Sequence, residues 1–367
     1  MHDLRHIASL FDMRADFVHA HPYGSGHIND TYCAWYDQAG LRVRFIHQRV
    51  NSNVFKRPVE LMENVERVTR HALAVLTESG NPEARRRTLT CIPARDGKPY
   101  AIGPDGSVWR TYPFIERARG FDELETNLQA YEAARAFGAF QNLAAGLPGG
   151  RLHETIPDFH HTPKRLAALH AALATDAHNR AVECKAELAF ALARTDDCAI
   201  VTSLIANGEI PERVTHNDTK LNNVLLDDVT AEGVCVIDLD TTMPGSALYD
   251  FGDMVRTAVP TTREDDTGLE NLDLRLDRFE ALVRGYLSAA AFLNPTEIGH
   301  LAYAGKLLTL ECGIRFLTDY LQGDSYFKIQ SASHNLDRCR NQFAFVSQLE
   351  IRMEELIGVV ERVRQGN

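Results

Sequence analysis

The predominant spacing of hydrophobic and polar positions differs between a strand-rich first third of the chain and a mostly helical remainder. In the first third, short apolar or alternating runs are separated by turn residues, as is typical of antiparallel strands. Apolar residues then recur at steps of three and four from Leu61 to Val75, which indicates a helix with Pro58 in its first turn. The pattern predicts helices over 1–10 and 58–79, and strands over 16–26, 28–35, 41–49, 87–93 and 107–114.

The helical spacing dominates beyond residue 116. It predicts helices over 122–145, 163–174, 180–207, 249–257, 273–291, 295–322 and 335–364. Two short apolar runs, 224–226 and 234–237, interrupt this series and predict a hairpin, because a polar turn segment joins them. The sequence therefore predicts an α+β fold with two lobes: a small N-terminal lobe with an antiparallel sheet, residues 1–116, and a larger helical lobe, residues 117–367.

Composition and charge narrow the class of protein. The chain has 367 residues, 44% of them hydrophobic and 24% charged, which is typical of a globular protein with a sizeable core. A net charge of -11 argues against a general nucleic-acid binder, which would concentrate Lys and Arg. Residues 1–10 lack the apolar run of a signal peptide, and no eighteen uncharged apolar residues occur together. We expect a cytoplasmic protein without a membrane or nucleic-acid partner, whose seven cysteines are buried thiols.

The candidate chemistry lies around the predicted hairpin. Asp218 and Asn223 are five positions apart, as in the H-x-D-x-x-x-x-N loop of protein-kinase-like enzymes, and Asp238 follows at the end of the second apolar run. A hairpin brings its two ends together, and Mg²⁺ takes one or two oxygen ligands from protein. Asn223 and Asp238 are therefore predicted to hold Mg²⁺, which leaves Asp218 free to accept a hydroxyl proton as the catalytic base.

Two further acidic residues follow these ligands. Because side chains alternate along a strand, Asp240 is predicted on the same strand face as Asp238, as a second contact to the metal or to the substrate. Asp250 opens the next predicted helix, where an N-cap or a brace for the catalytic loop is expected.

Several segments carry a resemblance to a known family. They are 22–29 with Thr31 and Tyr32, 48–51, 61–66, 214–223, 237–241 with 243–246, and 311–317 with 319–321. In these segments the chain resembles the aminoglycoside phosphotransferase and choline kinase superfamily, and more closely its N-acetylhexosamine 1-kinase branch. The resemblance implies a protein-kinase-like fold with ATP as co-substrate and Mg²⁺ as cofactor. It also implies transfer of the γ-phosphoryl group to the anomeric hydroxyl of GlcNAc or GalNAc.

The resemblance assigns the nucleotide side of the site. Gly24, Ser25 and Gly26 would cover the phosphates, although such a turn is more often only a hairpin connection. Residues 109–116 would form the hinge, with Phe114 and Glu116 beside the nucleotide; the alternative is an edge strand with Pro113. Gln48 stands where most members have the Lys that pairs with the α- and β-phosphates, so Mg²⁺ would neutralise more of the charge.

The resemblance likewise assigns His27, Arg315 and Tyr326 as contacts of the sugar. Without it, His27 is a surface histidine, and Arg315 forms an i,i+4 ion pair with Asp319. The choice of the anomeric hydroxyl rests on the resemblance alone.

Two alternative functions stay open at this point. An aminoglycoside, choline or homoserine phosphotransferase keeps the chemistry and changes the acceptor; the acidic run 264–266 with Glu270 and Asp273 suits an aminoglycoside. A nucleotide-binding scaffold without catalysis is suggested only by Gln48, and the complete set of Asp218, Asn223 and Asp238 argues against it.

Overall fold

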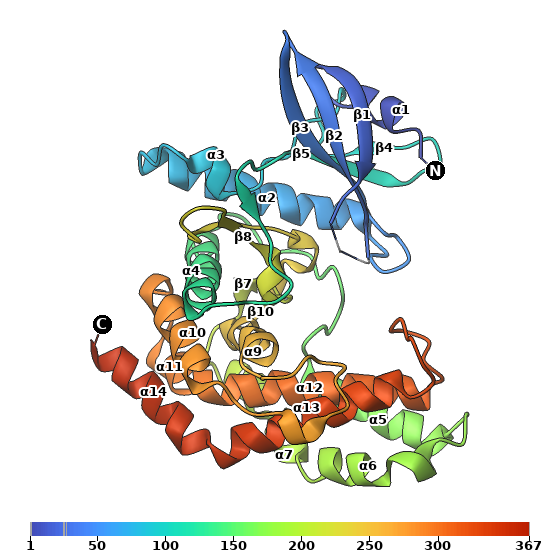
Figure 1. The fold of residues 1–367 in the computed structure, drawn as a ribbon, viewed down its shortest axis with the longest axis vertical. Coiled ribbons are helices and arrows are strands. Elements are labelled where there is room, and N and C mark those ends of the chain that lie inside the picture. Colours follow the sequence, from blue (N-terminus) through green and yellow to red (C-terminus); the bar gives the residue numbers. More distant parts are fainter. Residues whose placement is uncertain (1, 25, 27, 367) are drawn as a thin grey trace.

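A five-stranded antiparallel sheet forms the N-terminal part of the computed structural model, which describes residues 2–24, 26 and 28–366. Figure 1 shows this sheet at one end of the molecule, next to helices α1 and α2. The strand order is β1 (Asp16–Pro22), β2 (Asp30–Gln38), β3 (Leu41–Arg49), β5 (Val108–Pro113) and β4 (Ala101–Ile102); α1 spans Leu4–Ser9 and α2 spans Pro58–Glu78. The predicted helix over 58–79 is thus confirmed, and its periodic residues Leu61, Val65, Val68 and Ala72 are buried.

The C-terminal part is mostly helical and contains two small antiparallel sheets (Figure 1). In one sheet β6 (Ala118–Arg119) and β9 (Gly233–Val236) flank β8 (Val224–Asp227), and in the other β7 (Arg213–Thr215) pairs with β10 (Met243–Gly245). The longer helices are α4 (Asn127–Ala144), α5 (Thr162–Thr175), α9 (Ala247–Ala258), α10 (Leu276–Ala289), α12 (Leu301–Leu321), α13 (His334–Ile351) and α14 (Met353–Gly366). The predicted α+β division and the 224–237 hairpin are confirmed.

The chain leaves the N-terminal sheet after Pro113 and enters the C-terminal part as β6. Of the residues expected to form the hinge, 109–113 belong to β5, which lies between β3 and β4 and is therefore not an edge strand. Only 114–116 lie in the connection between the two parts, and their role as a hinge stays a prediction. The lobe boundary at residue 116 falls within this connection and stays a prediction.

Three of the predicted helices are broken. Residues 180–207 form η1 (Ala181–Cys184), α6 (Lys185–Leu192), α7 (Thr195–Cys198) and α8 (Ile200–Ala206). Residues 295–322 divide at His300 into α11 (Pro295–Gly299) and α12, and residues 335–364 divide at Arg352 into α13 and α14. The apolar spacing continues across each break because the pieces on both sides contribute to a buried core. Spacing alone therefore does not mark where the axis turns.

The strand predicted over 87–93 is wrong. Residues 84–87 form the short helix α3 (Ala84–Arg87), and the following segment reaches the sheet through a bond from Ile92 N to Thr111 O of 2.8 Å. Arg86 donates to the carbonyl oxygens of Glu116 and Arg117 and pairs with Asp227 of β8 at 2.9 Å. The arginines of α3 therefore contact the connection and the C-terminal hairpin, whose carbonyl and carboxylate oxygens offer them partners.

Helices α4 and α10 approach each other closely at Gly285, and this contact predicts a stability effect. A Cβ on Gly285 would overlap the backbone carbonyl oxygen of Tyr131 in α4. We expect Gly285→Ala to lower the free energy of unfolding by about 1–3 kcal/mol, because the overlap outweighs the helix preference of Ala. In the control Gly358→Ala, the nearest atom to the new Cβ is Arg362 Nη1 at 3.5 Å, so no loss is expected. Urea unfolding measures both, and a Gly285→Ala variant as stable as the wild type would contradict the prediction.

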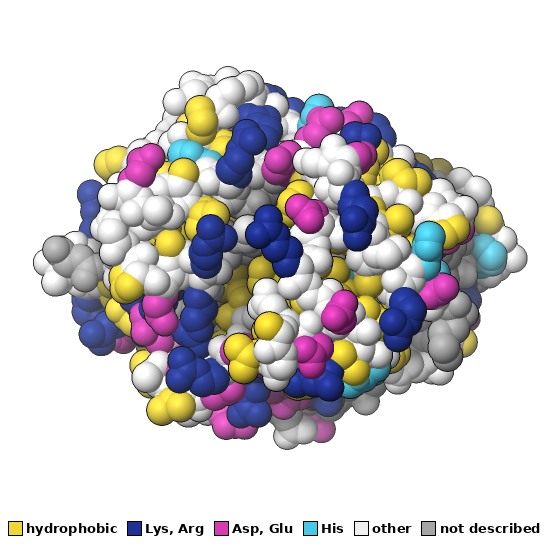
Figure 2. All heavy atoms as spheres, turned by 90° about the horizontal axis from the view of Figure 1, so that it is seen from above, with side chains coloured by type: hydrophobic (Ala, Val, Ile, Leu, Met, Phe, Trp, Pro, Cys, Tyr) yellow, Lys and Arg dark blue, Asp and Glu magenta, His cyan; other side chains and the backbone are white. Residues whose placement is uncertain are grey.

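The exposed side chains carry charges of both signs, and most of the cysteines are buried. In the view of Figure 2, basic and acidic side chains are interspersed, with hydrophobic groups between them. All seven cysteines are free, and five of them are buried. Within residues 2–24, 26 and 28–366, no helix combines the length and the apolar content needed to cross a membrane.

Candidate active site

The loop that carries Asp218 joins β7 to β8, and its backbone is held by hydrogen bonds to Asp250 of α9. The Asp250 carboxylate accepts the backbone N–H groups of Asn217 at 2.7 Å and of His216 at 2.8 Å, and the side chain of Gln141 at 2.6 Å. Asn217 has a left-handed backbone with φ of 64°, a conformation that Asn tolerates. The brace predicted at Asp250 is confirmed. Its predicted N-cap role is wrong, because Ser246 caps α9.

His216 links this loop to the end of the hairpin. Its Nε2 donates to the carbonyl oxygen of Ile237 at 2.9 Å, and its Nδ1 accepts the backbone N–H of Asp218 at 3.3 Å. One nitrogen donates while the other accepts, so this hydrogen bonding assigns a neutral imidazole. The residues before Asp218 and Asp238 are thereby held together, as the hairpin predicted.

Asp218 has a cation beside it that the sequence reasoning missed. Lys220 Nζ lies 3.3 Å from Asp218 Oδ1, and Asn223 Nδ2 donates to the backbone oxygen of Asp218 at 2.8 Å. Burial raises the pKa of Asp218, but the positive charge of Lys220 and its hydrogen bond to the carboxylate outweigh burial and leave that pKa lowered. Asp218 is therefore an ionised carboxylate, as a proton acceptor must be. The available signal was a Lys two positions after the loop Asp.

Asp238 does not share a strand face with Asp240, so that prediction is wrong. Strand β9 ends at Val236, and Asp238 has a left-handed backbone with φ of 59° that turns the chain into η3 (Leu239–Thr241). None of the described residues donates a hydrogen bond to the Asp238 side chain or forms an ion pair with it. Burial, Asp240 and Asp218 together raise the pKa of Asp238. Its carboxylate thus lies among negative charges without a cation of its own.

This donor set fits Mg²⁺. The Asn223 amide nitrogen faces Asp218, and among the described residues no donor reaches the Asn223 side-chain oxygen, which is the atom that would bind a cation. The described residues contain no cluster of three His, Cys, Asp or Glu able to hold a metal by themselves. Mg²⁺ does not need one, because water and phosphate usually complete its octahedron. The positions of these oxygen atoms are compatible with Asn223 and Asp238 as ligands, and the assignment stays a prediction.

The residues predicted to contact the nucleotide lie along the N-terminal side. Gly24 has φ of +84°, which favours glycine, while Ser25 and His27 lie outside the described residues. Nothing lies within 4 Å of a Cβ built on Gly26. Farther along the chain, Asn29 Nδ2 donates to Asp240 Oδ2 at 2.6 Å, so the start of β2 lies beside the metal loop. That placement suits the predicted cover over the phosphates.

The side chains of Phe114 and Glu116 pack around Arg44 of β3. The Arg44 guanidinium lies 3.6 Å from the Phe114 ring centre, and its Nε is 3.0 Å from Glu116 Oε1. Their contact with the nucleotide stays a prediction.

The side chain of Gln48 is hydrogen-bonded to Arg110 of the neighbouring strand. Its Oε1 accepts Nε and Nη2 of Arg110 at 2.8 and 2.6 Å. Arg110 in turn forms an ion pair with Asp240. Arg110 was not predicted, because nothing in the local pattern of β5 marks it.

On the predicted acceptor side, Arg315 is surrounded by aromatic rings. Its guanidinium lies 5.3 Å from the ring centre of Phe159, 6.0 Å from Tyr326 and 5.5 Å from Phe327. The alternative ion pair with Asp319 is wrong, because Asp319 instead accepts the backbone N–H groups of Tyr326 and Phe327 at 2.8 and 2.9 Å. No carboxylate among the described residues forms an ion pair with Arg315, so its donors stay available.

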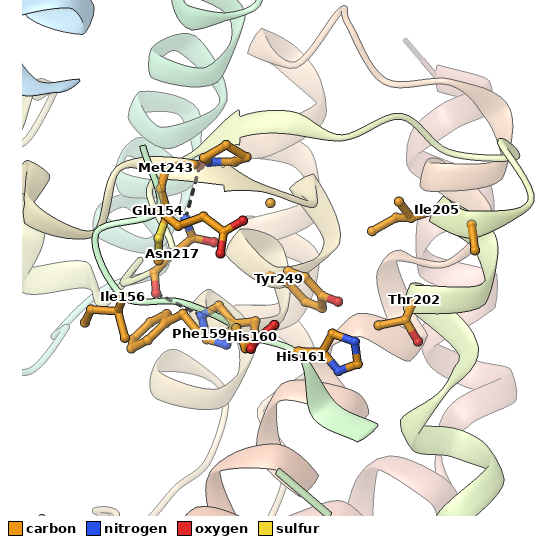
Figure 3. Close-up of a pocket in the computed structure, with 14 residues that line it drawn as sticks. Glu154, Ile156, Phe159, His160, His161, Thr202, Ile205, Asn217, Met243 and Tyr249 are labelled. Atoms are coloured by element: carbon orange, nitrogen blue, oxygen red, sulfur yellow. Dashed lines mark hydrogen bonds between the residues drawn. The ribbon is translucent and has the colours of Figure 1, made fainter. Parts of the chain in front are cut away.

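One turn before Arg315, Glu311 forms a buried pair with His160. Nδ1 of His160 lies 2.7 Å from Glu311 Oε1, and its Nε2 lies 2.9 Å from the carbonyl oxygen of Asn217. Both partners are acceptors, so both ring nitrogens donate and the ring is an imidazolium. Burial lowers the pKa of His160, but Glu311 outweighs it and leaves that pKa raised. Figure 3 shows His160 bonded to Asn217 in the wall of a cavity of about 270 Å³ that Tyr249 also lines.

This pair predicts a pH-dependent contribution to stability. Because the folded pKa of His160 is raised above its ordinary value of 6.5, the contribution is complete below that pH and is lost as the pH rises through the folded pKa. We expect His160→Gln to lower the free energy of unfolding by about 3–5 kcal/mol in mildly acidic solution, because Glu311 is left buried and unpaired. The deficit should shrink at alkaline pH. Thermal melting at about pH 6 and pH 9 measures it.

The control for this prediction is His153→Gln, which removes an exposed histidine 2.8 Å from Glu63 and should change little at either pH. A deficit of His160→Gln that stays constant across the range would contradict the imidazolium assignment.

The comparisons with known proteins agree with this geometry. A family model described as "Phosphotransferase enzyme family" matches residues 19–292. A spectinomycin phosphotransferase, APH(9)-Ia, in its AMP-bound complex has a TM-score of 0.54 at 14% identity, covering 94% of this chain and 96% of that chain. A choline kinase from Cryptosporidium parvum Iowa II has a TM-score of 0.53 at 14% identity, covering 92% and 91%.

An aminoglycoside phosphotransferase from Alicyclobacillus acidocaldarius is also similar, with a TM-score of 0.52 at 15% identity, covering 98% of this chain and 96% of that chain. At such identities the likeness concerns the fold, and it confirms the protein-kinase-like class expected from the sequence. The family model extends over most of the chain and includes the loop, the hairpin and Asp250. The chain therefore belongs to the phosphotransferase enzyme family.

Proposed function

We propose that this phosphotransferase transfers the γ-phosphoryl group of Mg-ATP to the anomeric hydroxyl of an N-acetylhexosamine, GlcNAc or GalNAc. The choice of acceptor rests on Arg315. Its guanidinium lies close to three aromatic rings, and it forms no ion pair with any of the described residues. The proposal agrees with the resemblance of the sequence to the N-acetylhexosamine 1-kinase branch.

In this reaction Asp218 accepts the proton of the acceptor hydroxyl as the hydroxyl oxygen forms a bond to the γ-phosphorus and ADP leaves. Lys220 and the amide of Asn223 hold the Asp218 carboxylate in place. Asn223 and Asp238 would bind Mg²⁺, which neutralises phosphate charge when bound. Phe114 and Glu116 would contact the nucleotide, and the turn at Gly24 and Gly26 would cover its phosphates. Asp250 and His160 fix the loop, because positioning is most of what phosphoryl transfer requires.

The charge around Arg315 favours a neutral acceptor. Choline is a quaternary ammonium, which proteins bind in a cage of aromatic rings. Here Phe159, Tyr326 and Phe327 surround a cation that belongs to the chain itself, so a second cation would meet repulsion. A sugar offers hydroxyl and acetamido oxygens, which can accept the guanidinium donors, and an aromatic wall such as Tyr326, which is 63% exposed, suits a pyranose.

The acidic run 264–266 is largely engaged with basic groups of the same chain. Glu264 pairs with Arg256 and Arg338, and Asp265 lies 3.7 Å from His334 Nε2. A polycationic aminoglycoside would have to compete with these partners. This arrangement favours the sugar over the aminoglycoside as acceptor.

The test is to incubate the protein with ATP, Mg²⁺ and a matched panel of acceptors. The panel contains GlcNAc, GalNAc, a 1-deoxy analogue of GlcNAc, choline, homoserine and spectinomycin; ADP release gives the rate, and phosphorus NMR gives the position of the phosphate. We expect turnover with the N-acetylhexosamines, an anomeric phosphate ester as product, and none with the 1-deoxy analogue. Faster turnover of choline or spectinomycin, or a 6-phosphate product, would overturn the proposal.

Arg315 provides the matching variant. We expect Arg315→Met to raise the KM for the sugar by roughly 10–1000-fold, as the loss of charged hydrogen bonds requires, while the KM for ATP changes little. Steady-state kinetics with each substrate varied in turn measures the two constants. Equal effects on both constants would argue that Arg315 acts through the fold.

A further inference from the structure

Arg110 is a buried cation on the strand next to the one that lacks its expected Lys. It lies in β5 directly opposite Gln48 of β3, and only 1% of its surface is exposed. Two of its nitrogens donate to Gln48 Oε1, and the Gln48 amide nitrogen donates to Thr31 Oγ1 at 2.9 Å. The side chain of Gln48 is thus occupied in holding Arg110. The N-terminal sheet therefore contains a buried cation on β5, next to the position on β3 where the Lys was expected.

The third nitrogen of Arg110 crosses to the C-terminal part. Its Nη1 forms an ion pair with Asp240 Oδ1, while Asp240 Oδ2 accepts Asn29 Nδ2 at 2.6 Å. Both carboxylate oxygens of Asp240 therefore contact groups of the N-terminal part, one from Arg110 of β5 and one from Asn29, which directly precedes β2. Asp240 is itself only 2% exposed. It stands two residues after Asp238, in the η3 turn that Asp238 opens.

We propose that Arg110 is a positioning residue for phosphoryl transfer, and that Asp240 is the anchor through which it acts rather than a metal ligand. Together they fix the turn that carries Asp238 against the N-terminal sheet, beside β5 and Asn29. A non-glycine residue with a left-handed backbone persists where its surroundings determine its conformation. The anchor supplies that constraint two residues after Asp238. The proposal rests on the proposed use of a magnesium nucleotide.

The chemistry of the pair supports a positioning role over a purely stabilising one. Replacing a buried ion pair by apolar residues of similar volume is often neutral or stabilising, so such a pair is weak evidence for a contribution to stability. The hydrogen bonds of Arg110 to Gln48 and of Asn29 to Asp240, in contrast, are directional and determine how each member of the pair is oriented where the two chain segments meet. A Lys at position 48 would place a second cation against Arg110, which explains why Gln48 and Arg110 occur together.

The experiment compares Arg110→Met, Arg110→Lys, Asp240→Asn and the double variant Arg110→Met/Asp240→Asn with the wild type. Calorimetry measures ADP binding with Mg²⁺ and with EDTA, and melting curves measure stability. We expect Arg110→Met and Asp240→Asn each to weaken magnesium-dependent ADP binding by roughly 10–100-fold, the range for groups that support a metal ligand. The double variant should be no worse than either single variant, because both remove the same link. Arg110→Lys should recover part of the affinity.

A matched control is Arg278→Met, which removes another buried arginine that donates to Asn127 and Leu124, neither of which is a predicted nucleotide or metal contact. It should lower stability without changing magnesium-dependent ADP binding.

Two outcomes would overturn the inference. One is an Arg110→Met variant that binds Mg-ADP as tightly as the wild type. The other is a loss of affinity in Asp240→Asn that is far larger than in Arg110→Met and additive with it in the double variant, which would make Asp240 a metal ligand. A wild type that binds Mg-ADP but phosphorylates no sugar refutes only the proposed acceptor. Absence of magnesium-dependent binding in the wild type would refute both.

Discussion

Asp218→Asn should lower kcat by about 10²–10⁴-fold, the range that a positioned general base contributes. The amide keeps the size of the carboxylate and can still accept a hydrogen bond from Lys220, so the loop should retain its shape. What is lost is the capacity to take the acceptor proton. The lowered pKa of Asp218 makes this capacity present at neutral pH in the wild type.

Initial rates of ADP release give kcat, and calorimetry gives the affinity for Mg-ADP, which should stay within a few-fold of the wild type. Lys220→Met is the companion variant. Removal of Lys220 takes away a charge that lowers the pKa of Asp218 but leaves the base itself in place, so a smaller loss of kcat is expected. Turnover of Asp218→Asn close to that of the wild type would remove the base assignment.

Asp238→Asn should lower the affinity for Mg²⁺ in the presence of nucleotide by at least about 100-fold. Even groups that only support a metal ligand change metal affinity by roughly 10–100-fold. The carboxylate of Asp238 has no cation of its own among the described residues and lies near Asp218 and Asp240. Removal of its charge relieves repulsion in the metal-free protein. The variant should therefore melt at a temperature equal to or above that of the wild type when EDTA is present.

A metal ligand and a structural residue are distinguished by these two measurements. Substitution of a metal ligand lowers the magnesium affinity while the melting temperature in EDTA stays the same or rises, whereas substitution of a structural residue lowers the melting temperature. Titration of free Mg²⁺ at fixed nucleotide, with ADP release as the readout, gives the apparent metal affinity. EDTA should abolish wild-type turnover and an excess of Mg²⁺ should restore it. A variant that melts far below the wild type and keeps its magnesium dependence would contradict the assignment.

The parts of the fold that could be predicted from the sequence are those set by local spacing. The 224–237 hairpin follows from two apolar runs and a polar turn, and α2 follows from the step between Leu61 and Ala72. The brace at Asp250 was predicted because the acidic residue opens a helix immediately after the metal loop. In these cases the residues that determine the structure are close together in the chain.

The parts that could not be predicted depend on contacts between distant segments. Arg110 meets Gln48 only through the register of two strands that are 62 residues apart, and His160 meets Glu311 across 151 residues. No local spacing contains that information. The left-handed backbone of Asp238 was missed for a different reason: an apolar run followed by Asp-x-Asp has the same alternation whether the strand continues or stops.

The arginines of α3 have a mechanical consequence. They tie the segment after α2 to the carbonyl oxygens of residues 116 and 117 and to the hairpin of the other lobe, and α2 itself packs against α4. Helix α2 is thereby coupled to the larger lobe, although it precedes the connection in the chain. A rotation of the N-terminal sheet relative to the larger lobe would therefore have to break the ion pair of Arg110 with Asp240, and would have to either slide the sheet against α2 or separate α2 from α4.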